Sequence, residues 1–438
     1  KKGKEAWVRP TVQDGRVHYE VVHDSIGPAD DGTINRKGAV SMADGTPIGF
    51  DHIRTESRAG RMGADLIAVV AEGPHGRLYI SPTAEHTKAA EVPRPEGLSD
   101  AELPEQALGF RVQNYGIKRW VDLFTNRQLV AMATLSDLVA EVREQIVVDA
   151  VIAGVPERDR LAEGGSDAQA YADAVATYLA LGVSRATDYN STLAGWNSLR
   201  DGMRNVFARQ ALPMLWDFAE ANFFSSSSGS FLGQVDWVSR VLEHVPADIS
   251  GDVEQVSASL ASYGGTVIST DPPYYDNIGY SDLSDYFYVW LRRCLQDIHP
   301  SVVGTMLTPK ADELVADPYR HNGKGGAKQF FVDGFNFVFR RIRQGATTDA
   351  PMTVYYAYKQ QDAEADGTSS TGWHTLLDGL IEAGWEITAT WPVRSERAGR
   401  ARDIGSNALA SSIVLACRPR PVDADSITRR LFVARLKS

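Results

Sequence analysis

The chain has 438 residues, and its 45 basic and 56 acidic side chains give a formal net charge of −11 at pH 7. This length can bury a large core and suggests two or three domains. The acidic balance argues against a generally basic nucleic-acid coat, so any contact with nucleic acid must come from local basic clusters. Cys294 and Cys417 are too few for a disulfide framework or a Cys-rich zinc site, so we expect no metal and a cytoplasmic location. No apolar run is long enough to span a membrane, and no secretory signal is visible.

Residues 1–83 are expected to form a small β-rich domain, because short β-branched and aromatic runs alternate there with polar residues. The expected strands and their hairpin connection are Trp7-Val8, Val17–Val22, Leu66–Ala71, Leu78–Ile80 and, as the connection, Glu72–Gly76. Between them, Arg54, Arg58 and Arg61 lie in a segment expected to be a loop. This loop is either a solvated surface loop or a loop that contacts phosphate groups.

Residues 84–106 are rich in proline and acidic residues and show no periodicity, so we expect a linker there. Residues 107–250 are expected to form a helical segment. Its best-defined helix begins after Thr125, a favourable N-cap, where apolar residues recur at helical spacing. Further helices are expected around residues 167–182, 195–210 and 231–244.

Residues 251–438 change to alternating strands and helices. The expected strands are Thr266–Ser269, Met352–Tyr358, Glu386–Trp391 and Ser412–Cys417. The expected helices are 282–297, 329–343 and Trp373–Ala383, the last ended by Gly384. Cys294 lies on the apolar face of the first of these helices, which indicates a core residue rather than a nucleophile. Residues 300–328 are polar and glycine-rich, and a loop of that length in a compact domain is usually functional or mobile.

The rest of the chain is organised around the stretch Thr270-Asp271-Pro272-Pro273-Tyr274-Tyr275. The strand must end there, because neither proline can donate a hydrogen bond to a sheet. Asp271 and Tyr274 are therefore left at the carboxyl end of a strand, which is where ligands bind in open α/β sheets. A strand that ends in an ordinary turn is the structural alternative.

Asp-Pro-Pro-Tyr resembles the catalytic motif of the amino-methyltransferases that act on adenine N6 or cytosine N4. An exocyclic amine is a poor nucleophile, because its lone pair is delocalised into the ring. A carboxylate and a backbone carbonyl that accept its two N–H bonds can aim the lone pair at a methyl donor. Pro272 and Pro273 would fix that carbonyl, and Tyr274 would offer a ring on which an extruded base can stack.

The order of the predicted elements also resembles the C-terminal half of a Rossmann-like methyltransferase sheet. More closely, the chain resembles large prokaryotic adenine-specific DNA methylases, which are often encoded near phage-defence or restriction genes, including DISARM-type systems. The stretches that carry this resemblance are Val112–Gly116, Leu123–Gln128, Trp216–Asn222, Ser269–Tyr280 and Ser406–Ser412. The expected fold is thus α/β, with a Rossmann-like region at 251–438, a helical segment and a small β-rich N-terminal domain.

The resemblance implies AdoMet-dependent (S-adenosyl-L-methionine-dependent) methylation of adenine N6 in DNA, in phage defence or restriction-modification. The catalytic residues that it implies are Asp271, Pro272, Pro273 and Tyr274. The candidate cofactor contacts are Asp271, Phe124, Thr125 and Asn407. The candidate DNA contacts are Tyr275, Asn277, Lys310, Arg320, Arg394, Arg397, Arg400 and Arg402. Phe124-Thr125 is otherwise a plain helix cap, and the four last arginines are otherwise a solvated charged hairpin.

Two features depart from the family pattern. Members of the group carry a zinc ribbon in the region matching residues 1–83, but Ser41 and Asp44 stand where a Cys-x-x-Cys pair is expected, so we predict no structural zinc. The glycine-rich cofactor turn is also missing, because Gly323–Gly326 follows no apolar strand and Gly154 stands alone in a helical pattern. In the relatives this turn lies in an N-terminal half, which we expect to be truncated or to reside on another polypeptide.

Two other functions fit the sequence. An RNA or protein-amide methyltransferase can share an Asn/Asp-Pro-Pro-Tyr/Phe motif. The chain could instead be a non-catalytic DNA-recognition or assembly subunit of a defence complex, inactive without its cofactor-binding half. The expected partners are DNA and a separate N-terminal half or other defence-system subunits, and no membrane is expected.

Overall fold

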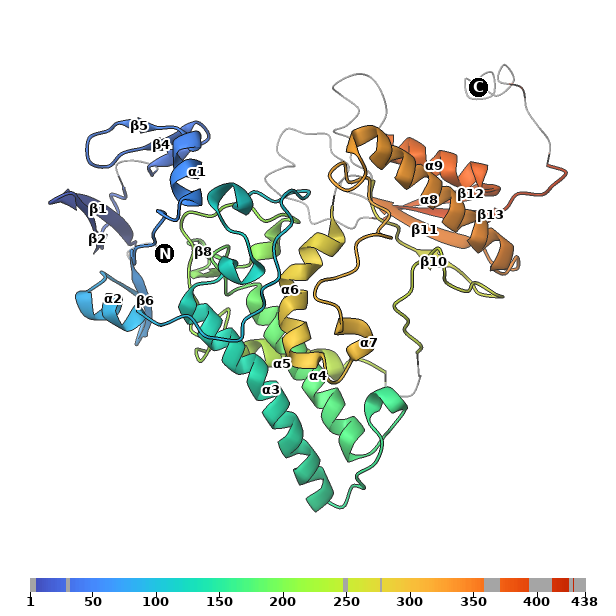
Figure 1. The fold of residues 1–438 in the computed structure, drawn as a ribbon, viewed down its shortest axis with the longest axis horizontal. Coiled ribbons are helices and arrows are strands. Elements are labelled where there is room, and N and C mark those ends of the chain that lie inside the picture. Colours follow the sequence, from blue (N-terminus) through green and yellow to red (C-terminus); the bar gives the residue numbers. More distant parts are fainter. Residues whose placement is uncertain are drawn as a thin grey trace. The chain divides into compact units, whose positions relative to one another are not determined.

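The computed structural model is a mixed α/β protein (Figure 1). It describes residues 5–28, 32–246, 251–275, 278–357, 371–393, 412–424 and 428. Internal contacts divide the chain into two compact units, which are Lys1–Ser250 with Tyr280–Pro309, and Gly251–Gly279 with Lys310–Ser438. This division does not separate the expected regions 1–83, 84–106 and 107–250, and it places Tyr280–Pro309 in the first unit rather than in the region 251–438.

The first unit begins with three small antiparallel sheets. They comprise β1 Trp7–Gln13 with β2 Arg16–Val22, then β3 Ile34–Asn35 with β4 Gly38–Val40 and β5 Pro47–Ile48, then β6 Val69–Gly73 with β7 Gly76–Ile80. The turn between β1 and β2 is tight because Asp14 and Gly15 both have positive φ, of 51° and 71°, as two-residue hairpin turns require. The β-rich character expected for this region is present, although residues 66–68 lie outside the strand expected there.

The expected loop around the N-terminal arginines is wrong, because α1 spans Phe50–Arg58. Arg54 and Arg58 therefore lie on a helix. Arg58 Nε donates to the carbonyl of Asn114, and Arg61, beyond the helix, pairs with Glu56 at 2.6 Å. Arg54 Nη1 lies 3.5 Å from Asp51 Oδ1, so all three arginines have partners within the chain. The helical spacing of apolar residues did not indicate α1, because a nine-residue helix contains few repeats of its apolar face.

Helices dominate the rest of the first unit. They are α2 Ala84–Ala90, η1 Val112–Tyr115, η2 Trp120–Leu123, α3 Asn126–Ile152, η3 Leu161–Glu163, α4 Ala168–Thr187, η4 Val206–Ala208, α5 Phe231–Leu242, α6 Tyr280–Leu295 and α7 Pro300–Val303. The expected start of α3 is confirmed, because Thr125 and Gln128 form a capping box. The expected linker at 84–106 contains α2, and the long loop expected at 300–328 contains α7 and the start of α8.

The helix expected at 195–210 is wrong. β8 Gly195–Asn197 and β9 Gly202–Arg204 form a hairpin there, and Asp201 has a φ of +50°. Gly195 and Gly202 make this segment a poor helix, because glycine loses more backbone freedom in a helix than other residues do.

The core of the first unit lies where α3, α4 and α6 pack together, and Figure 1 shows α3 and α4 side by side. Trp120, Leu123, Leu129, Met132 and Val183 are fully buried. Cys294 on α6 is 7% exposed, and burial raises the pKa of its thiol to about 11. The expectation that Cys294 is a core residue is therefore confirmed.

The second unit contains a four-stranded sheet with the strand order β10-β11-β13-β12. The strands are β10 Ser269–Thr270, β11 Met352–Ala357, β12 Trp385–Val393 and β13 Ser412–Pro419. β10 and β11 are parallel, and β13 is antiparallel to both of its neighbours. The helices α8 Gly323–Gly345 and α9 Thr371–Glu382 contribute Phe331, Leu376 and Leu380 to the core against this sheet.

Three strands and two helices of this unit lie close to where the sequence predicts them. Gly384 follows α9 with a φ of +85°, which ends the helix as expected. The motif strand is shorter than expected and lies later in the chain, because Thr266 and Val267 are exposed and pairing is confined to Ser269 and Thr270. Since β10 and β11 are parallel, residues that follow them meet at one edge of the sheet.

Candidate functional site

Asp271 lies directly after β10 and is an exposed residue. The preceding Ser269 and Thr270 pair with Thr353 and Val354 of β11, and the Thr353 hydroxyl donates to Ser269 Oγ at 3.0 Å. Pairing stops at Thr270, as the two prolines that follow Asp271 require. A carboxylate is thus held at the carboxyl end of a short strand in an accessible position.

Tyr274 is the described partner of that carboxylate. Its hydroxyl donates to Asp271 Oδ1 at 2.9 Å. Its ring meets the ring of Tyr356 edge-on, with centroids 5.3 Å apart at an interplanar angle of 83°. Tyr356, on β11, is 4% exposed and also packs against Trp373 of α9, at 5.8 Å. The buried Tyr356 ring therefore holds Tyr274 so that the Tyr274 hydroxyl orients Asp271, and Trp373 in turn packs against Tyr356.

Tyr275 takes a different position from the exposed base contact that the sequence suggested. Its ring packs edge-on against the fully buried Phe331, with centroids 5.1 Å apart, and its carbonyl accepts from Ala316 N at 2.7 Å. Its φ is +21°, an unusual value that costs about 1–3 kcal/mol in a non-glycine residue. A Cβ on Gly372 would come within 3.1 Å of Tyr275 Cβ, so close packing maintains this backbone. Tyr275 thus anchors the motif to the core.

Arg320 is likewise engaged within the protein. Its guanidinium lies 2.7 Å from a Glu313 carboxylate oxygen and 3.5 Å from one of Asp317, and its side chain is 19% exposed. The two carboxylates compensate its charge, so the geometry favours a structural role over a phosphate contact. Lys310 is half-buried. The remaining nucleic-acid candidates, namely Asn277, Arg394, Arg397, Arg400 and Arg402, and the cofactor candidate Asn407 lie outside the described residues.

Phe124 and Thr125, the other candidate cofactor contacts, belong to the first unit. The Phe124 ring is 5% exposed, stacks on Tyr286 at 5.7 Å and meets Trp290 edge-on at 5.3 Å. Thr125 Oγ1 accepts from Gln128 N at 3.3 Å, and the Gln128 side chain accepts from Thr125 N at 2.9 Å. Of the two interpretations the sequence allows, the geometry therefore favours the helix cap.

The turn that replaces the expected Cys-x-x-Cys pair is closed by hydrogen bonds. Ser41 N donates to the carbonyl of Thr46 at 2.8 Å, and Asp44 Oδ1 accepts from Thr46 N at 3.1 Å. The hydrogen bond from Ser41, followed by those from Thr46, lowers the pKa of the Asp44 carboxyl. Within the described part of the chain no cluster of three or more His, Cys, Asp or Glu side chains could hold a metal ion. The absence of structural zinc stays a prediction.

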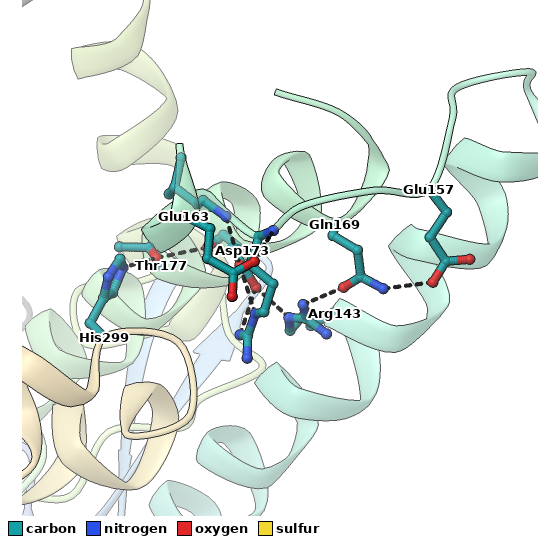
Figure 2. A network of polar contacts seen from close by, with 9 residues as sticks. Arg143, Glu157, Glu163, Gln169, Asp173, Thr177 and His299 are labelled. Carbon is teal, nitrogen blue, oxygen red and sulfur yellow. Dashed lines mark hydrogen bonds and ion pairs between the residues drawn. The ribbon is translucent and has the colours of Figure 1, made fainter. Parts of the chain in front are cut away.

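A second acidic cluster, which the sequence did not reveal, lies in the first unit around Asp173 (Figure 2). Asp173 is fully buried, and it accepts hydrogen bonds from Arg143 at 2.6 Å, from Arg160 at 3.0 and 3.1 Å and from the backbone of Leu161 at 3.2 Å. Burial raises the pKa of this carboxyl, but the hydrogen bonds from Arg160 and Arg143 outweigh it, so the pKa is lowered. No single spacing could reveal a group assembled from α3, α4 and the loop between them.

The aromatic support of the motif was also missed. Tyr356 reaches Tyr274 because β11 pairs in register with β10, and Trp373 of α9 packs in turn against Tyr356. One sequence signal could have suggested this support, namely an aromatic residue near the end of β11, the next strand of the second unit after the motif strand. A register of this kind is set by tertiary packing.

A scan against protein-family models gives no matching family, and searches of curated proteins and of solved structures give no match. The family resemblance of the motif therefore stays a prediction. Among the described helices, none is long and apolar enough to cross a membrane.

Proposed function

We propose that the chain is the catalytic and target-handling part of an AdoMet-dependent DNA methyltransferase that modifies the exocyclic amine of adenine. The observation that carries this proposal is the arrangement at the end of β10. There an exposed carboxylate precedes two prolines and accepts a hydrogen bond from the hydroxyl of the next tyrosine. Asp271 provides a fixed hydrogen-bond acceptor for the target amine, and Tyr274 provides an adjacent ring for the target base.

Each residue of the motif then has a defined task. Asp271 accepts one N–H of the target amine, and the Pro272 carbonyl accepts the other, which directs the nitrogen lone pair away from the ring system. Tyr274 holds the carboxylate through its hydroxyl and presents its ring to the extruded base. Tyr356 keeps that ring in place. The reaction needs no protein nucleophile, which agrees with the burial of Cys294 and Cys417.

The arrangement of the second unit supports a Rossmann-like assignment. In the chain β10 is followed by α6 and α7, which belong to the first unit, and then by α8, β11, α9, β12 and β13. Within the second unit alone, the order β10, α8, β11, α9, β12, β13 is the one that the methyltransferase resemblance implies. β13 lies between β11 and β12 and runs antiparallel to both. The second unit thus contains a parallel strand pair with the motif at its carboxyl end, which is the ligand-binding edge in α/β sheets.

The residues present fit the target-amine side of this reaction better than its cofactor side. AdoMet supplies the methyl group when it is bound. Of the described residues nominated for it, Asp271 is exposed, whereas Phe124 is buried in a core and Thr125 caps a helix. We therefore derive no step through the cofactor, and we include in the proposal a separate cofactor-binding half or polypeptide. We keep Arg394, Arg397, Arg400 and Arg402 as the proposed phosphate contacts, in a phage-defence or restriction-modification setting.

The test offers radiolabelled AdoMet and four acceptors to the full-length protein that carries this chain. The acceptors are adenine-containing DNA, DNA whose only exocyclic amines are on cytosine and guanine, RNA of the same sequence, and a protein mixture. Transfer to adenine-containing DNA alone is the expected result. Transfer to RNA or protein instead would favour the alternative methyltransferases, and DNA binding without any transfer would favour a recognition or assembly subunit.

A further inference from the structure

The sheet of the second unit has one face that packs against helices and a second face that carries exposed aromatic rings. Met352, Val354 and Tyr356 of β11 belong to the core that α8 and α9 complete. Neighbouring residues of a strand point to opposite faces, so Tyr355 points away from this core. Tyr355 is 41% exposed. An aromatic ring is thus accessible on the face opposite the two helices.

A β-bulge in β12 brings a second ring to the same face. Ile387 packs against the core, and simple alternation along the strand would turn Trp391 toward the core as well. The register with β13 shifts between Ile387 and Ala389. Thr388 is the extra residue, and its hydroxyl donates to the carbonyl of Ala416 at 3.2 Å. The bulge therefore re-aims Trp391 away from the core, where it is 52% exposed.

The two exposed rings lie in one row across the sheet, which we call the aromatic row and which comprises Tyr355, Val414 and Trp391. Val414 of β13 is directly opposite Tyr355 on one side and directly opposite Trp391 on the other. Directly opposed residues share a face, so the two rings flank Val414, which is 7% exposed. Since neighbouring strands lie about 4.8 Å apart, the backbones that carry the rings are about 10 Å apart. The next row on this face comprises Thr353, Ala416 and Ala389.

The aromatic row lies level with Asp271. Thr270 pairs with Val354 in parallel register, so Asp271 and Tyr355 are the next residues of their two chain segments. All of these residues belong to the second unit. The row therefore starts one strand away from the carboxylate of the proposed target site and runs from there across the sheet.

The chemistry of this face fits an unpaired nucleic-acid strand better than a further layer of protein. A helix layer needs a continuous apolar surface. Here the two rings are exposed and separate, and the residues between them are small and buried, so the face offers two distinct stacking sites. Every base has a π-face that can stack on such a ring, whatever the sequence. Arg418 and Glu386 oppose each other farther along the same face, so this pair adds no net charge that would repel phosphates.

We propose that the DNA substrate binds as an unpaired strand, with the target base at Asp271 and neighbouring bases stacked on Tyr355 and Trp391. This inference rests on the proposed function, because it takes DNA as the substrate. The bases of a duplex are stacked on one another, so their faces are not free for rings that stand about 10 Å apart. The aromatic row thus selects DNA that is already open beside the target.

The experiment measures how the full-length protein binds fluorescent oligonucleotides, by anisotropy and without AdoMet. The three probes are a single strand, the same sequence as a duplex, and the same strand with abasic sites on both sides of the target adenine. The intact single strand should bind about tenfold more tightly than either of the others, because only its neighbouring bases are free to stack. Equal affinity for the intact and the abasic strand, or tighter binding of the duplex, would overturn the proposal.

Variants assign the effect to the two rings. Tyr355→Ala and Trp391→Ala should each weaken binding of the single strand by about tenfold, whereas Tyr355→Phe and Trp391→Phe keep a ring and should retain most of the affinity. The slope of log affinity against log salt should not change, since no phosphate contact is lost. Tyr319→Ala, an equally exposed tyrosine of the same unit outside the sheet, is the matched control and should bind as the wild type does.

Binding and methyl transfer can fail separately. If the wild type methylates DNA and both alanine variants keep the wild-type affinity and rate, the proposed function stands and the aromatic row is refuted, which leaves the face to a protein partner. If no acceptor is methylated but the alanine variants lose single-strand binding, the row is a nucleic-acid surface and the proposed function is wrong. If one alanine variant does not fold, the phenylalanine variant at that position and the alanine variant at the other still decide.

Discussion

Two aspartates, one in each unit, show how differently the same carboxylate is used. Asp173 is fully buried and accepts hydrogen bonds from Arg143, Arg160 and the backbone of Leu161 (Figure 2). Asp271 is an exposed residue at a strand end, and its carboxylate accepts a hydrogen bond from the Tyr274 hydroxyl. The first carboxylate is saturated by cations and links three segments of the fold, whereas the second keeps acceptor capacity at the surface.

The difference follows from the cost of burying a charge. A buried carboxylate is stable only if cations and donors replace its lost water, and removing them is strongly destabilising. An exposed carboxylate keeps its water, so a ligand can replace that water without a penalty of the same size. Asp173 should therefore matter for folding and little for chemistry, and Asp271 the reverse. The predictions that follow test this contrast, beginning with the largest effect.

Asp271→Ala should abolish methyl transfer and leave the fold unchanged, because an exposed strand-end carboxylate supports no core. Removal of one preorganised group from such a site reduces the rate by about 10²–10³-fold even when the rest is intact. The measurement is the initial rate of label transfer from AdoMet to DNA in the full-length protein. Asp349→Ala, in an exposed loop of the same unit, is the matched control and should keep the wild-type rate. A wild-type rate for Asp271→Ala would remove the motif from the chemistry.

Asp173→Ala should destabilise the first unit by about 3 kcal/mol, since it leaves the Arg143 guanidinium, 17% exposed, without its carboxylate. Urea unfolding followed by circular dichroism measures this. The DNA-binding and transfer properties of the folded variant should not change. If Asp173→Ala unfolds at the wild-type urea concentration, the network in Figure 2 contributes nothing to stability and the contrast with Asp271 is lost.

The same aspartate gives a pH prediction. The pKa of Asp173 is lower in the folded protein than in the unfolded chain, where it is about 3.9. Its contribution is therefore fully present above about pH 4 and is lost as the pH falls through the folded value. The difference in unfolding free energy between wild type and Asp173→Asn should shrink below about pH 4. A constant difference from pH 7 to pH 3 would contradict the lowered pKa.

The sequence predicted those elements whose signals are local. Thr125 begins α3 and Gly384 ends α9 where expected, because caps act within one turn of a helix. It failed at residues 195–210, where two glycines favour a hairpin, and at Tyr280–Pro309, which was assigned to the other unit. An apolar helix face shows that a helix is buried, but it does not show which neighbours bury it.

The candidate site divides in the same way. The position of Asp271 at a strand end followed from Pro272 and Pro273 alone. The support from Tyr356 could not be predicted, because it depends on strands more than eighty residues apart pairing in register. The hydrogen bond from Tyr274 to Asp271 spans only three residues, but no spacing in the sequence fixes the direction of either side chain. Arg320 shows the opposite limit, since a basic residue in a polar segment suggests a ligand contact, whereas Glu313 and Asp317, which lie close enough to compensate its charge, favour a structural role.

Tyr274→Phe tests how far Asp271 depends on its neighbour. The ring stays against Tyr356, and only the hydroxyl that donates to Asp271 Oδ1 is lost. We expect a reduction of about tenfold in the transfer rate, equal to about 1.4 kcal/mol and close to the lower end of the range of about 1.5–3 kcal/mol for one hydrogen bond to a charged group. Tyr274→Ala should lose more, because the stacking surface disappears as well. Equal rates for wild type and Tyr274→Phe would show that the hydroxyl does not position the carboxylate.

The smallest effect is expected at Thr125, where the helix cap and the cofactor contact make opposite predictions. Thr125→Ala removes the oxygen that accepts from Gln128 N, so it should lower stability by about 1 kcal/mol. Thr125→Ser keeps that oxygen and should restore most of the loss. Neither change should alter the affinity for AdoMet, measured by calorimetry on the full-length protein, if the hydroxyl serves only the capping box. A several-fold loss of AdoMet affinity in Thr125→Ala, at unchanged stability, would return Thr125 to the cofactor side. It would also show that a residue whose hydrogen bonds are satisfied within the folded chain can still contact the cofactor.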